Sequence, residues 1–471
     1  MIENLNVQSV IGLSVREMRW LSGLIKTFNN HQFNNQKKNK YYEGHITLSE
    51  VNLGIALPKA MRNLEIGCEW GAKAVDVLAS RSMFDGFVGV NGNNLESVQK
   101  IVDDNRFIYE YMKACKDQLK YGCTFATLTA DDEGKCKIKF HSPLSATALW
   151  NGVKGRIDCG LAIMNTKLDN EDSTYKPSRF RMYTDTDILD ISQREDGQWI
   201  AIRHPHIMGR PLMEPLIWNA TSDKPFGRSR IKEPVRRLIE GYVRTVANAT
   251  IGLEFATSPQ KYLLGVTDDQ YDAIVNQKFQ QYVGSILAST SNPETGQNPT
   301  FGQLSQGSLE PHVQMLRMLA TQFSAATGLT VTDTGVINDA NPTSSDAILA
   351  QAQTLVLLAE QLNQGNAVAL QKIIQMAQAI NKKVPLEELT EDELNVIPHF
   401  KNPAMPSVSV TADAAVKIAS VRPNFGSTDT FLEMVGFDQA DIRRINAQEQ
   451  RARGATVLTE EFSGEFDEDI S

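Results

Sequence analysis

A run of residues from Ser344 to Ile380 constrains the fold more than any other part of the chain. It contains no proline and a single glycine, Gly365, and it opens on a Ser-Ser-Asp sequence typical of a helix start. After Asp346 its only charges are Glu360 and Lys372, and apolar residues and glutamine occupy nearly every face. A helix that is apolar on all faces must be covered on all faces. Because one chain of this size has difficulty doing so, we expect a neighbouring copy to cover part of it. The residues predicted to lie in that interface are Leu355, Leu358, Leu362 and Ile373.

Two amphipathic helices are predicted on either side of an insert. Residues 225–257 and 309–327 place apolar side chains at steps of three and four, the spacing that gathers them on one helix face. The second helix opens on Glu310-Pro311 and ends at Gly328, both typical helix boundaries. The predicted stripes are Ile231, Val235, Leu238, Tyr242, Val246, Ala249 and Leu253 in the first helix, and Val313, Leu316, Met318, Leu319 and Phe323 in the second.

The insert between these helices, residues 258–308, has strand-like segments at 262–266 and 284–288 and a stretch rich in Ser, Thr, Asn, Gly and Pro. Such a segment buries little by itself, so neighbouring copies are expected to order it. The alternative is a surface insertion without a partner. After the second helix, residues 328–343 are polar and longer than most helix connections, which predicts either a functional loop or a plain mobile connection.

Residues 1–224 are predicted to form a mixed α+β domain. Helical spacing occurs at 14–35, 63–82 and 95–120, and the polar run at 29–40 is expected to cross open surface as a solvated loop. The period then changes to two. Residues 125–140 alternate on both sides of an acidic turn, and residues 180–202 contain similar alternating segments, which together predict antiparallel hairpins.

The C-terminal part, residues 385–459, is punctuated by prolines before helical spacing resumes. Three short helices are predicted at 413–420, 427–435 and 438–453, separated by Pro423, Gly426 and Gly436. Residues 460–471 hold six acidic residues and no basic one, which predicts a disordered, solvated tail.

Several short blocks, taken in their order along the chain, resemble one known family. They are Tyr41-Tyr42-Glu43-Gly44-His45, Trp70 ahead of Val75-Asp76-Val77-Leu78-Ala79, Pro225-Phe226-Gly227-Arg228-Ser229-Arg230-Ile231, Phe301-Gly302-Gln303-Leu304, Leu309-Glu310-Pro311-His312 and Leu316-Arg317-Met318-Leu319-Ala320. From about Tyr41 to Arg453 the chain resembles the portal proteins of tailed bacteriophages with long non-contractile tails. The resemblance implies a portal fold of the α+β class that assembles as a ring.

That architecture divides the chain into named parts. They are a mixed α+β wing at 1–224, stem helices at 225–257 and 309–327, a small β-containing clip at 258–308, a tunnel loop at 328–343, a long wing and tunnel helix at 344–384, a helical crown at 385–459 and the acidic tail at 460–471. The implied function is a dodecameric ring at one capsid vertex, or a thirteen-fold ring for the isolated protein, through which double-stranded DNA enters during packaging and leaves during ejection. The implied partners are the terminase large subunit, the head-tail adaptor, and the major capsid and scaffolding proteins. The implied location is the virion, and the host bacterial cytoplasm during assembly.

The resemblance places the tunnel loop and the stem next to the DNA. The expected loop positions are Thr332, Asp333, Asn338, Asp339 and Asn341, whose short polar or acidic side chains do not hold phosphate tightly. The stem candidates are Lys232, Arg236, Arg237 and Arg244. For these cations, ion pairs with Glu233 and Glu240, three or four positions away, are an equally good explanation.

The charge balance limits how the chain can meet nucleic acid. With 47 basic and 56 acidic side chains the net charge is −9, which argues against a broad basic binding surface. It suits a conduit, because accumulated cationic contacts would hold a moving duplex too tightly. The five cysteines are odd in number and form no CxxC pair, so neither a disulfide framework nor a zinc site is predicted. No apolar stretch reaches the ~18 residues of a membrane span and no secretory leader is recognisable, so we expect no membrane partner.

Enzyme signatures are absent from the sequence. There is no phosphate loop, HExxH pair or nucleophile elbow, so we expect no catalytic residue, no cofactor and no metal. His204-Pro205-His206 is interpreted as surface sequence because no third ligand lies nearby. Two alternative functions stay open. One is another ring-forming structural or adaptor protein of the head or tail, and the other is a metal-dependent DNA-processing enzyme using the acidic turn Asp131-Asp132-Glu133.

Overall fold

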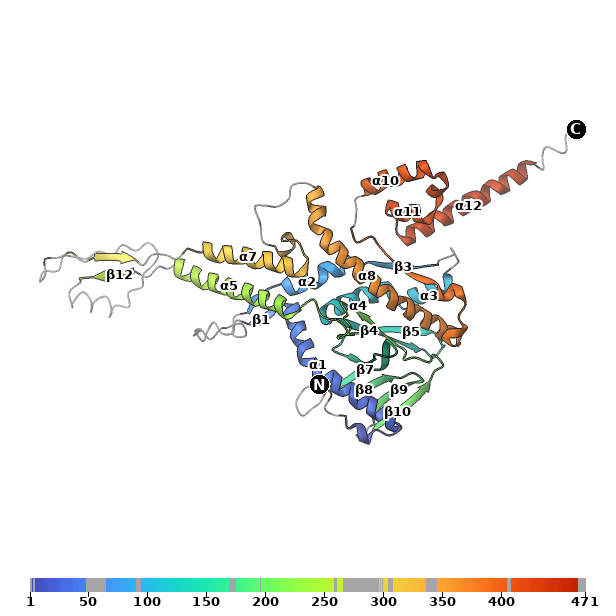
Figure 1. Ribbon diagram of the computed structural model, residues 1–471, viewed down its shortest axis with the longest axis horizontal. Coiled ribbons are helices and arrows are strands. Elements are labelled where there is room, and N and C mark those ends of the chain that lie inside the picture. The colour runs from blue at the N-terminus through green and yellow to red at the C-terminus, as the bar shows by residue number, and fades with distance from the viewer. Residues whose placement is uncertain are drawn as a thin grey trace.

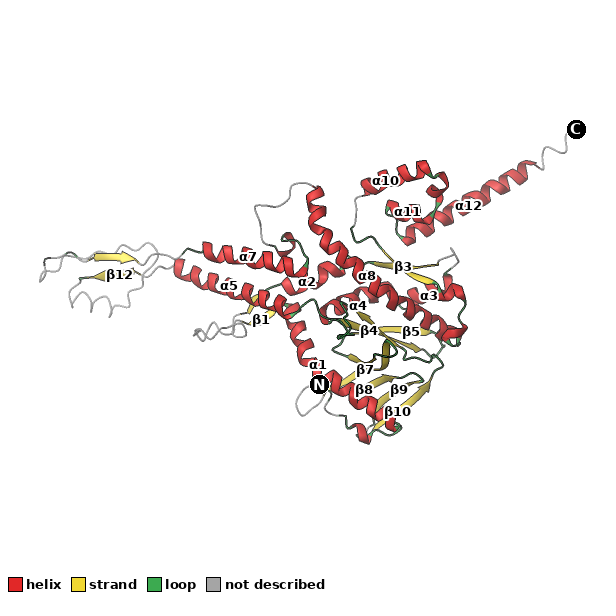
Figure 2. Ribbon diagram, in the orientation of Figure 1, coloured by secondary structure: helices red, strands yellow, loops and turns green. Residues whose placement is uncertain are grey.

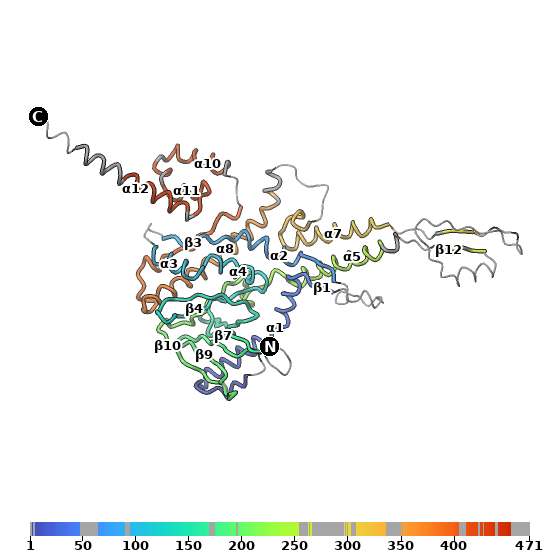
Figure 3. The backbone as a smooth tube through the Cα atoms, turned by 180° about the vertical axis from the view of Figure 1, so that it is seen from behind, coloured from blue at the N-terminus to red at the C-terminus, as the bar shows by residue number. Residues whose placement is uncertain are grey.

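The computed structural model describes residues 2, 5–47, 65–89, 95–168, 175–194, 196–257, 261–265, 296, 298, 300–303, 308–335, 345–404 and 408–464. These residues form a mixed α+β structure with several small sheets, as predicted (Figure 2). A body of sheets and helices carries a two-helix arm on one side and a group of C-terminal helices on the other (Figure 1). The view from behind shows the arm and the last helix extending in opposite directions (Figure 3).

One part of the body is a five-stranded antiparallel sheet covered by the long helix α1, Val15–Glu43. Leu21, Leu24 and Phe28 of α1 form a core with strand residues that include Phe180 and Trp199. The strands predicted between residues 180 and 202 are confirmed, whereas the sequence pattern does not predict the first two strands of the sheet. In spatial order the strands are β10 (Trp199–Pro205), β9 (Asp187–Gln193), β8 (Tyr175–Tyr183), β7 (Arg156–Leu168) and β6 (Ala146–Asn151).

The polar run at 29–40 is helical, so the prediction of a surface loop is wrong. Helix α1 continues through this run to Gly44, which ends the helix in a left-handed conformation with φ of 74°. Gln32 and Asn35 are buried, and their amides donate hydrogen bonds to the Pro143 carbonyl oxygen at 3.1 and 3.4 Å. Amides that find partners inside the fold are stable on a buried helix face. Polarity alone therefore misplaces this segment.

A second, larger core lies between a three-stranded sheet and four helices. Strand β4 (Cys123–Ala130) lies between β11 (Met213–Ile217) and β5 (Cys136–His141), and β4–β5 is the hairpin predicted at 125–140. The helical spacing at 95–120 is split by Arg106, whose backbone is left-handed with φ of 48°. The helices are α2 (Trp70–Ala79), α3 (Glu96–Asp104), α4 (Phe107–Tyr121) and α8 (Ser345–Lys382).

Two small sheets complete the body. Strand β1 (His45–Thr47) pairs with β2 (Glu65–Gly67), so the helical prediction at 63–82 is wrong for Glu65–Gly67, and the α-helix among the described residues of that segment is Trp70–Ala79. Strand β3 (Phe84–Gly89) pairs with β14 (Val396–Phe400). The predicted helical crown at 385–459 is therefore wrong at its start, because β14 is a strand that pairs with β3 of the body. The segment before β14 contains the 3₁₀ turn η5 (Leu386–Glu388) and α9 (Glu391–Leu394).

Helix α8 is covered largely by its own chain. Leu355, Leu362 and Ile373 are at most 1% exposed inside the larger core, so the prediction that they contact a neighbouring copy is wrong. Leu358, the fourth predicted interface residue, is only partly buried. The body covers the helix because β4, β5, β11 and β14 all contact it. The large apolar side chains that α8 exposes among the described residues are Leu357 and Val368, at 52% and 56%.

A buried network of amide and hydroxyl groups fixes α8 against α4. Asn366 donates from Nδ2 to the Tyr111 hydroxyl at 2.8 Å and to Gln118 Oε1 at 3.0 Å, and its Oδ1 accepts from Gln118 Nε2 at 2.7 Å. Ser82 Oγ donates to Asn363 Oδ1 at 2.6 Å and lies 2.7 Å from the Tyr111 hydroxyl. All five side chains are buried, so another rotation of α8 would leave polar groups without partners.

The C-terminal helices match the three predicted ones in number and order. Their bounds are α10 (Val408–Val421), α11 (Asp429–Val435) and α12 (Gln439–Gly464), with the 3₁₀ turn η6 (Pro423–Ser427) after α10. Residues 460–464 of the predicted disordered tail are helical, so that prediction is wrong for them, and residues 465–471 lie outside the described residues. No described residue after Phe400 belongs to either hydrophobic core.

A charged cluster joins these helices to the body. His399 of β14 lies with Nδ1 3.7 Å from Asp85 of β3 and with Nε2 3.8 Å from Glu433 of α11. The Lys401 ammonium lies 3.8 Å from Asp85 and 3.5 Å from Asp438, just before α12. The Asp85 carboxylate, aided by Glu433, raises the pKa of His399 above its ordinary value, while burial and Lys401 oppose the shift. The Lys401 ammonium donates a hydrogen bond to Asp438 Oδ2, whereas the contacts at 3.7 and 3.8 Å are attractions between charges.

Replacing Asn366 by alanine should destabilise the body. The change removes three hydrogen bonds and leaves the buried Gln118 amide without its partner, which costs about 1–3 kcal/mol. The thermal unfolding midpoint of the purified chain measures this loss. The matched control is Gln364→Ala at an exposed position of the same helix, which should change stability by about 0.5 kcal/mol or less. Equal midpoints for the two variants would contradict the role given to the network.

The junction with the C-terminal helices should weaken as pH rises. Because the folded-state pKa of His399 is raised, its ion pairs are fully present below the ordinary value of 6.5 and are lost as pH passes the higher folded value. Hydrogen exchange of α11 amides, corrected for intrinsic pH dependence, should therefore accelerate above that window. His399→Gln should abolish the response, and His204→Gln, at an exposed position of β10, should preserve it. A response that survives His399→Gln would assign the effect to another group.

Candidate functional site

The arm consists of two antiparallel helices, α5 (Glu233–Thr257) and α7 (Glu310–Thr327), which project from the body (Figures 1 and 3). Both predicted helices are confirmed, although the first begins at Glu233 rather than at residue 225. Gly241 permits their close approach, since a Cβ there would lie 3.1 Å from Leu319 Cδ2. Beyond the far ends of the helices, β12 (Lys261–Leu264) pairs with β13 (Thr300–Gln303) in an antiparallel ribbon. The strand predicted at 284–288 lies outside the described residues.

The buried face of α5 differs from the predicted stripe. Leu238 and Tyr242 are only half-buried, and Leu253 is 50% exposed. Helix α5 carries two adjacent apolar rows, and the row at strict steps of four faces the core. The fully buried residues of that row are Ile231, Val235, Ile239, Val243 and Ala247. The spacing predicts the helix correctly but does not choose between the two rows.

Trp70, the first residue of α2, connects the base of the arm to the segment after α7. Its ring packs against Tyr242 of α5 and Phe323 of α7, with centroid separations of 4.7 and 4.8 Å. Its Nε1 donates a hydrogen bond to the Thr334 carbonyl oxygen at 3.1 Å. One buried side chain thus holds together α2, α5, α7 and the 3₁₀ turn η4 (Thr332–Thr334).

The first part of the segment predicted as the tunnel loop, residues 328–335, folds against the body. Gly328 ends α7 in a left-handed conformation, as predicted. The Asp333 carboxylate accepts hydrogen bonds from the Thr330 amide at 2.9 Å and the Thr330 hydroxyl at 2.8 Å, so it stabilises its own turn. Thr332 is exposed. The other predicted loop positions, Asn338, Asp339 and Asn341, lie outside the described residues.

Arg237 is engaged by acids of its own helix. Its guanidinium lies 3.4 Å from Glu233 and 3.1 Å from Glu240, which is the ion-pair explanation left open by the sequence. Glu240 is buried and also accepts a hydrogen bond from the Tyr41 hydroxyl near the end of α1. The pair therefore contributes to anchoring the arm on the body.

The other predicted stem cations differ in their surroundings. Arg236 is half-buried and donates to the Ile231 carbonyl oxygen at 3.2 Å. Arg244 is half-buried as well, and its Nε atom has no hydrogen-bond partner in the described part of the chain. Lys232 is exposed and extends over a pocket at the base of the arm. Sequence reasoning therefore finds the cations but not their environments.

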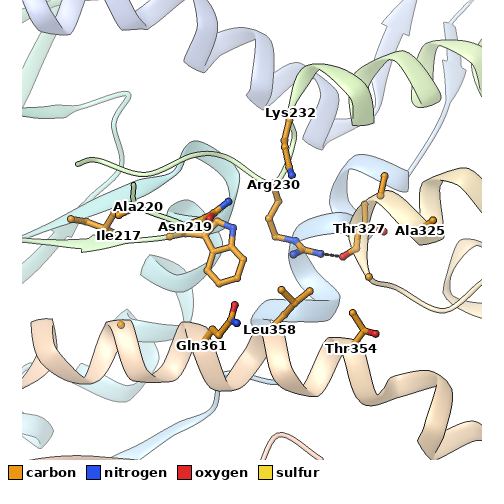
Figure 4. Close-up of a pocket in the computed structure, with 14 residues that line it drawn as sticks. Ile217, Asn219, Ala220, Arg230, Lys232, Ala325, Thr327, Thr354, Leu358 and Gln361 are labelled. Carbon is orange, nitrogen blue, oxygen red and sulfur yellow. Dashed lines mark hydrogen bonds between the residues drawn. The ribbon is translucent and has the colours of Figure 1, made fainter. Parts of the chain in front are cut away.

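The pocket has a volume of about 560 Å³ and lies where the base of the arm meets α8 (Figure 4). Asn219, which follows β11, and Gln361 of α8 contribute polar side chains to its wall. Lys232 and Arg230, from the segment before α5, point into the same space, with Thr327 at the end of α7 beside them (Figure 4).

Arg230 is the buried cation of this pocket, with 7% of its surface exposed. Its guanidinium donates hydrogen bonds to the carbonyl oxygens of Ala74 in α2 and Thr327 in α7, and it lies 6.0 Å from the Trp218 ring. No described carboxylate pairs with it, and burial lowers its pKa to about 10. Arg230 belongs to the stretch from Pro225 to Ile231 that resembles the family, but no role is predicted for it. The sequence does not reveal which arginine of Arg228-Ser229-Arg230 is buried.

The far half of the arm exposes apolar side chains. A two-stranded ribbon is marginal by itself in water, and apolar side chains gathered on an exposed element mark an interaction surface. No described residue of the same chain covers this surface, so it is available to a partner. Its members and exposed fractions are Leu253 at 50%, Val313 at 40%, Met315 at 39%, Met318 at 47%, Leu264 at 60% and Phe301 at 52%.

The acidic turn proposed for the enzyme alternative shapes the β4–β5 hairpin. Asp131 Oδ1 accepts hydrogen bonds from the backbone amides of Glu133 at 3.1 Å and Lys135 at 2.8 Å. Within the described ranges, no three His, Cys, Asp or Glu side chains are grouped as a metal site. A search of the same ranges for a helix both long and apolar enough to span a membrane also finds none.

Residues 25–455 match the family model described as phage portal protein, SPP1 Gp6-like. No curated protein matches the chain. Two similar solved chains belong to the neck of a native GTA particle computed with C12 symmetry and the neck of an empty GTA particle computed with C6 symmetry. The first alignment covers 80% of this chain and 89% of the other, and the second covers 76% and 87%. Both have 10% sequence identity and a TM-score of 0.44, too low to support a functional argument. Because the family model spans most of its length, this chain belongs to the SPP1 Gp6-like family of phage portal proteins.

Proposed function

We propose that this chain forms the ring at one vertex of a phage capsid, and that the ring is the channel for double-stranded DNA during packaging and ejection. Family membership supports the proposal. The structural observation that carries it is the projecting arm of α5 and α7, whose far half and terminal ribbon expose apolar side chains. A ring of copies supplies the cover that this surface needs.

The parts of the chain take distinct roles in this ring. Helices α5 and α7 form the stem, the ribbon of β12 and β13 belongs to the clip, residues 328–343 form the tunnel loop, and α10 to α12 form the crown. Each strand of a two-stranded ribbon has an outer edge, so ribbons of adjacent copies can pair edge to edge. Such pairing gives the outer edges of β12 and β13 backbone hydrogen-bond partners.

The channel wall contacts DNA weakly. Arg237 shares its charge with Glu233 and Glu240, while Arg236, Arg244 and Lys232 are the remaining stem candidates. Thr332 is the exposed member of the loop positions described. Pairing of Arg237 with acids of its own helix suits a duplex that must slide, because each phosphate contact adds to binding and to its salt dependence.

The same ring is a docking platform. The clip meets the terminase large subunit during packaging and the head-tail adaptor afterwards, and the wing meets the major capsid and scaffolding proteins. The portal family is structural, so the energy for packaging comes from the separate terminase motor. The ring is built in the host bacterial cytoplasm and remains at the portal vertex of the virion.

The proposal is tested by native mass spectrometry and cryo-electron microscopy of the purified chain. We expect a closed ring of twelve or thirteen copies with a central channel wide enough for duplex DNA, with α5 and α7 near the channel. A chain that stays monomeric or dimeric, alone and when co-expressed with its scaffolding protein, contradicts the proposal. A closed ring too narrow for a duplex favours the alternative of a structural adaptor.

Leu357→Asp should impair ring formation while leaving the chain folded. Leu357 is 52% exposed on α8, about three turns before exposed Val368 in the same row of the helix, and these two replace the buried residues first predicted for the interface. A charge placed in a desolvated contact costs several kcal/mol, whereas at a free surface it costs almost nothing. Val153→Asp is the matched control, since Val153 is 99% exposed in the turn between β6 and β7. Native mass spectrometry should show fewer rings for the first variant only, with unchanged circular dichroism for both.

A further inference from the structure

The pocket at the base of the arm holds a buried cation without a counter-ion. Arg230 is 7% exposed, and its guanidinium makes its hydrogen bonds to two neutral carbonyl groups, those of Ala74 and Thr327. Buried charges are stable when an opposite charge accompanies them. Among the described residues none forms an ion pair with Arg230. The fold therefore leaves one side of this arginine unmatched, and that side borders a pocket of about 560 Å³.

A second cation increases the positive potential of the pocket. The Lys232 side chain points toward Arg230, as Figure 4 shows, and no described acid pairs with its ammonium. Helix α5 begins at Glu233, directly after Lys232, so the positive end of its dipole lies beside Lys232, while the negative end of α7, which ends at Thr327, lies beside Arg230. Asn219 and Gln361 add hydrogen-bonding groups to the wall. The chemistry of the pocket is that of a site for a carboxylate or another small anion.

Helix α8 carries the complementary charge on a neighbouring face. Of the two charges in its long apolar run, Lys372 lies 3.7 Å from buried Glu214. Glu360, the other charge, is exposed and has no ion pair in the described structure. Glu360 is the one acidic residue in the part of α8 whose side chains the structure describes, so it is a candidate for contact with a cation of a neighbouring copy.

The helix geometry separates the pocket from this carboxylate. The α8 residues that line the pocket are Thr354, Leu358, Gln361 and Gly365, at steps of four, three and four, which is one face of the helix. Glu360 is one residue away, about 100° around the helix. It lies in the exposed row formed by Gln353, Leu357, Glu360, Gln364 and Val368. One helix thus presents a cationic pocket on one face and a carboxylate on the next.

We propose that the pocket of Arg230 and Lys232 receives the Glu360 carboxylate of a second copy of this chain. The contact is head to tail, because the pocket of one copy meets a different surface of the next, and contacts of this kind close into rings. It rests on the proposed ring and names one contact within it. It also moves Lys232 from the channel wall to the subunit interface. Exposed Leu357 lies one turn before Glu360 in the same row, and exposed Val368 lies about two turns after it, so both add apolar surface to the proposed interface.

Zero-length carbodiimide cross-linking of purified rings tests this contact directly. The reagent joins an ammonium to a carboxylate only when the two are in contact, so the multimer bands should contain a Lys232–Glu360 isopeptide, identified by mass spectrometry. The monomer band should lack it, which separates contact between copies from contact within one chain. Glu360→Gln should remove this product, and Glu310→Gln, at the start of α7, should leave it unchanged.

Charge reversal supplies an independent measurement. Lys232→Glu and Glu360→Lys should each raise the chain concentration at half-assembly by about tenfold, and the double variant should restore most of the loss, because the pair is reformed in reverse. Lys167→Glu, at an exposed position of β7, is the control for net charge and should have little effect.

The outcomes separate this contact from the ring itself. Normal rings without the isopeptide, or a double variant that assembles no better than the single ones, overturn the contact and leave the ring intact. Failure of the wild-type chain to form rings overturns the proposed function instead. If inorganic phosphate stabilises isolated chains through Arg230 and Lys232 while Glu360→Gln rings assemble normally, the pocket binds a free anion and the contact is wrong.

Discussion

The orientation of α8 is the constraint on which the rest of the structure depends, and a buried amide pair sets it. Asn366 and Gln118 exchange two hydrogen bonds inside the core, and Tyr111 completes the donor set of Asn366. Apolar packing alone tolerates sliding and rotation, because Leu, Ile and Ala side chains replace one another with small penalties. A buried amide tolerates neither, since a shifted partner leaves it unsatisfied. The surfaces that α8 presents to the pocket and to solvent are fixed as a result.

Trp70 extends this fixed frame to the arm. It contacts the base of both arm helices and holds the turn after α7, so the near half of the arm moves with the body. In the described part of the chain the far half has no such anchor, and it exposes its apolar side chains. The body therefore buries most of its own core, and in the proposed ring neighbouring copies cover the exposed apolar side chains of the arm. This division matches a subunit that folds first and assembles afterwards.

The sequence predicts those features whose cause is local. The hairpin at 125–140 follows from alternation around a turn, and α7 is bounded by Pro311 and Gly328 because their backbone preferences act within a few residues. The errors arise where distant groups decide. Gln32 and Asn35 look like loop residues until the Pro143 carbonyl, over a hundred positions away, accepts their hydrogen bonds.

The candidate site is predicted less completely, for the same reason. The positions of the stem helices and of their basic residues depend on nearby sequence, so the sequence predicts them correctly. Which apolar row of α5 is buried, and which arginine lacks an acid, depend on how elements pack, and periodicity carries no information on that. The apolar run of α8 shows this limit of sequence prediction most clearly. Its pattern indicates that the helix must be covered, but it does not indicate whether the same chain or another copy covers it. Here the body supplies most of it, as buried Leu355 and Ile373 show.

The part of α8 left uncovered is narrow, and its composition argues for a specific rather than a general contact. A purely apolar stripe would bind many surfaces, whereas Leu357 and Val368 flank a single carboxylate. A charge that is desolvated without its partner is expensive, so the apolar contact forms with full benefit only in the register that matches Glu360 with a cation. Because α8 is held by the Asn366 network, the orientation of Glu360 relative to the body of its own chain is fixed in every copy. In the proposed head-to-tail ring, that orientation is one of the factors that determine how many copies close the circle. In such a ring, a polar network deep inside one subunit influences the symmetry of the assembly.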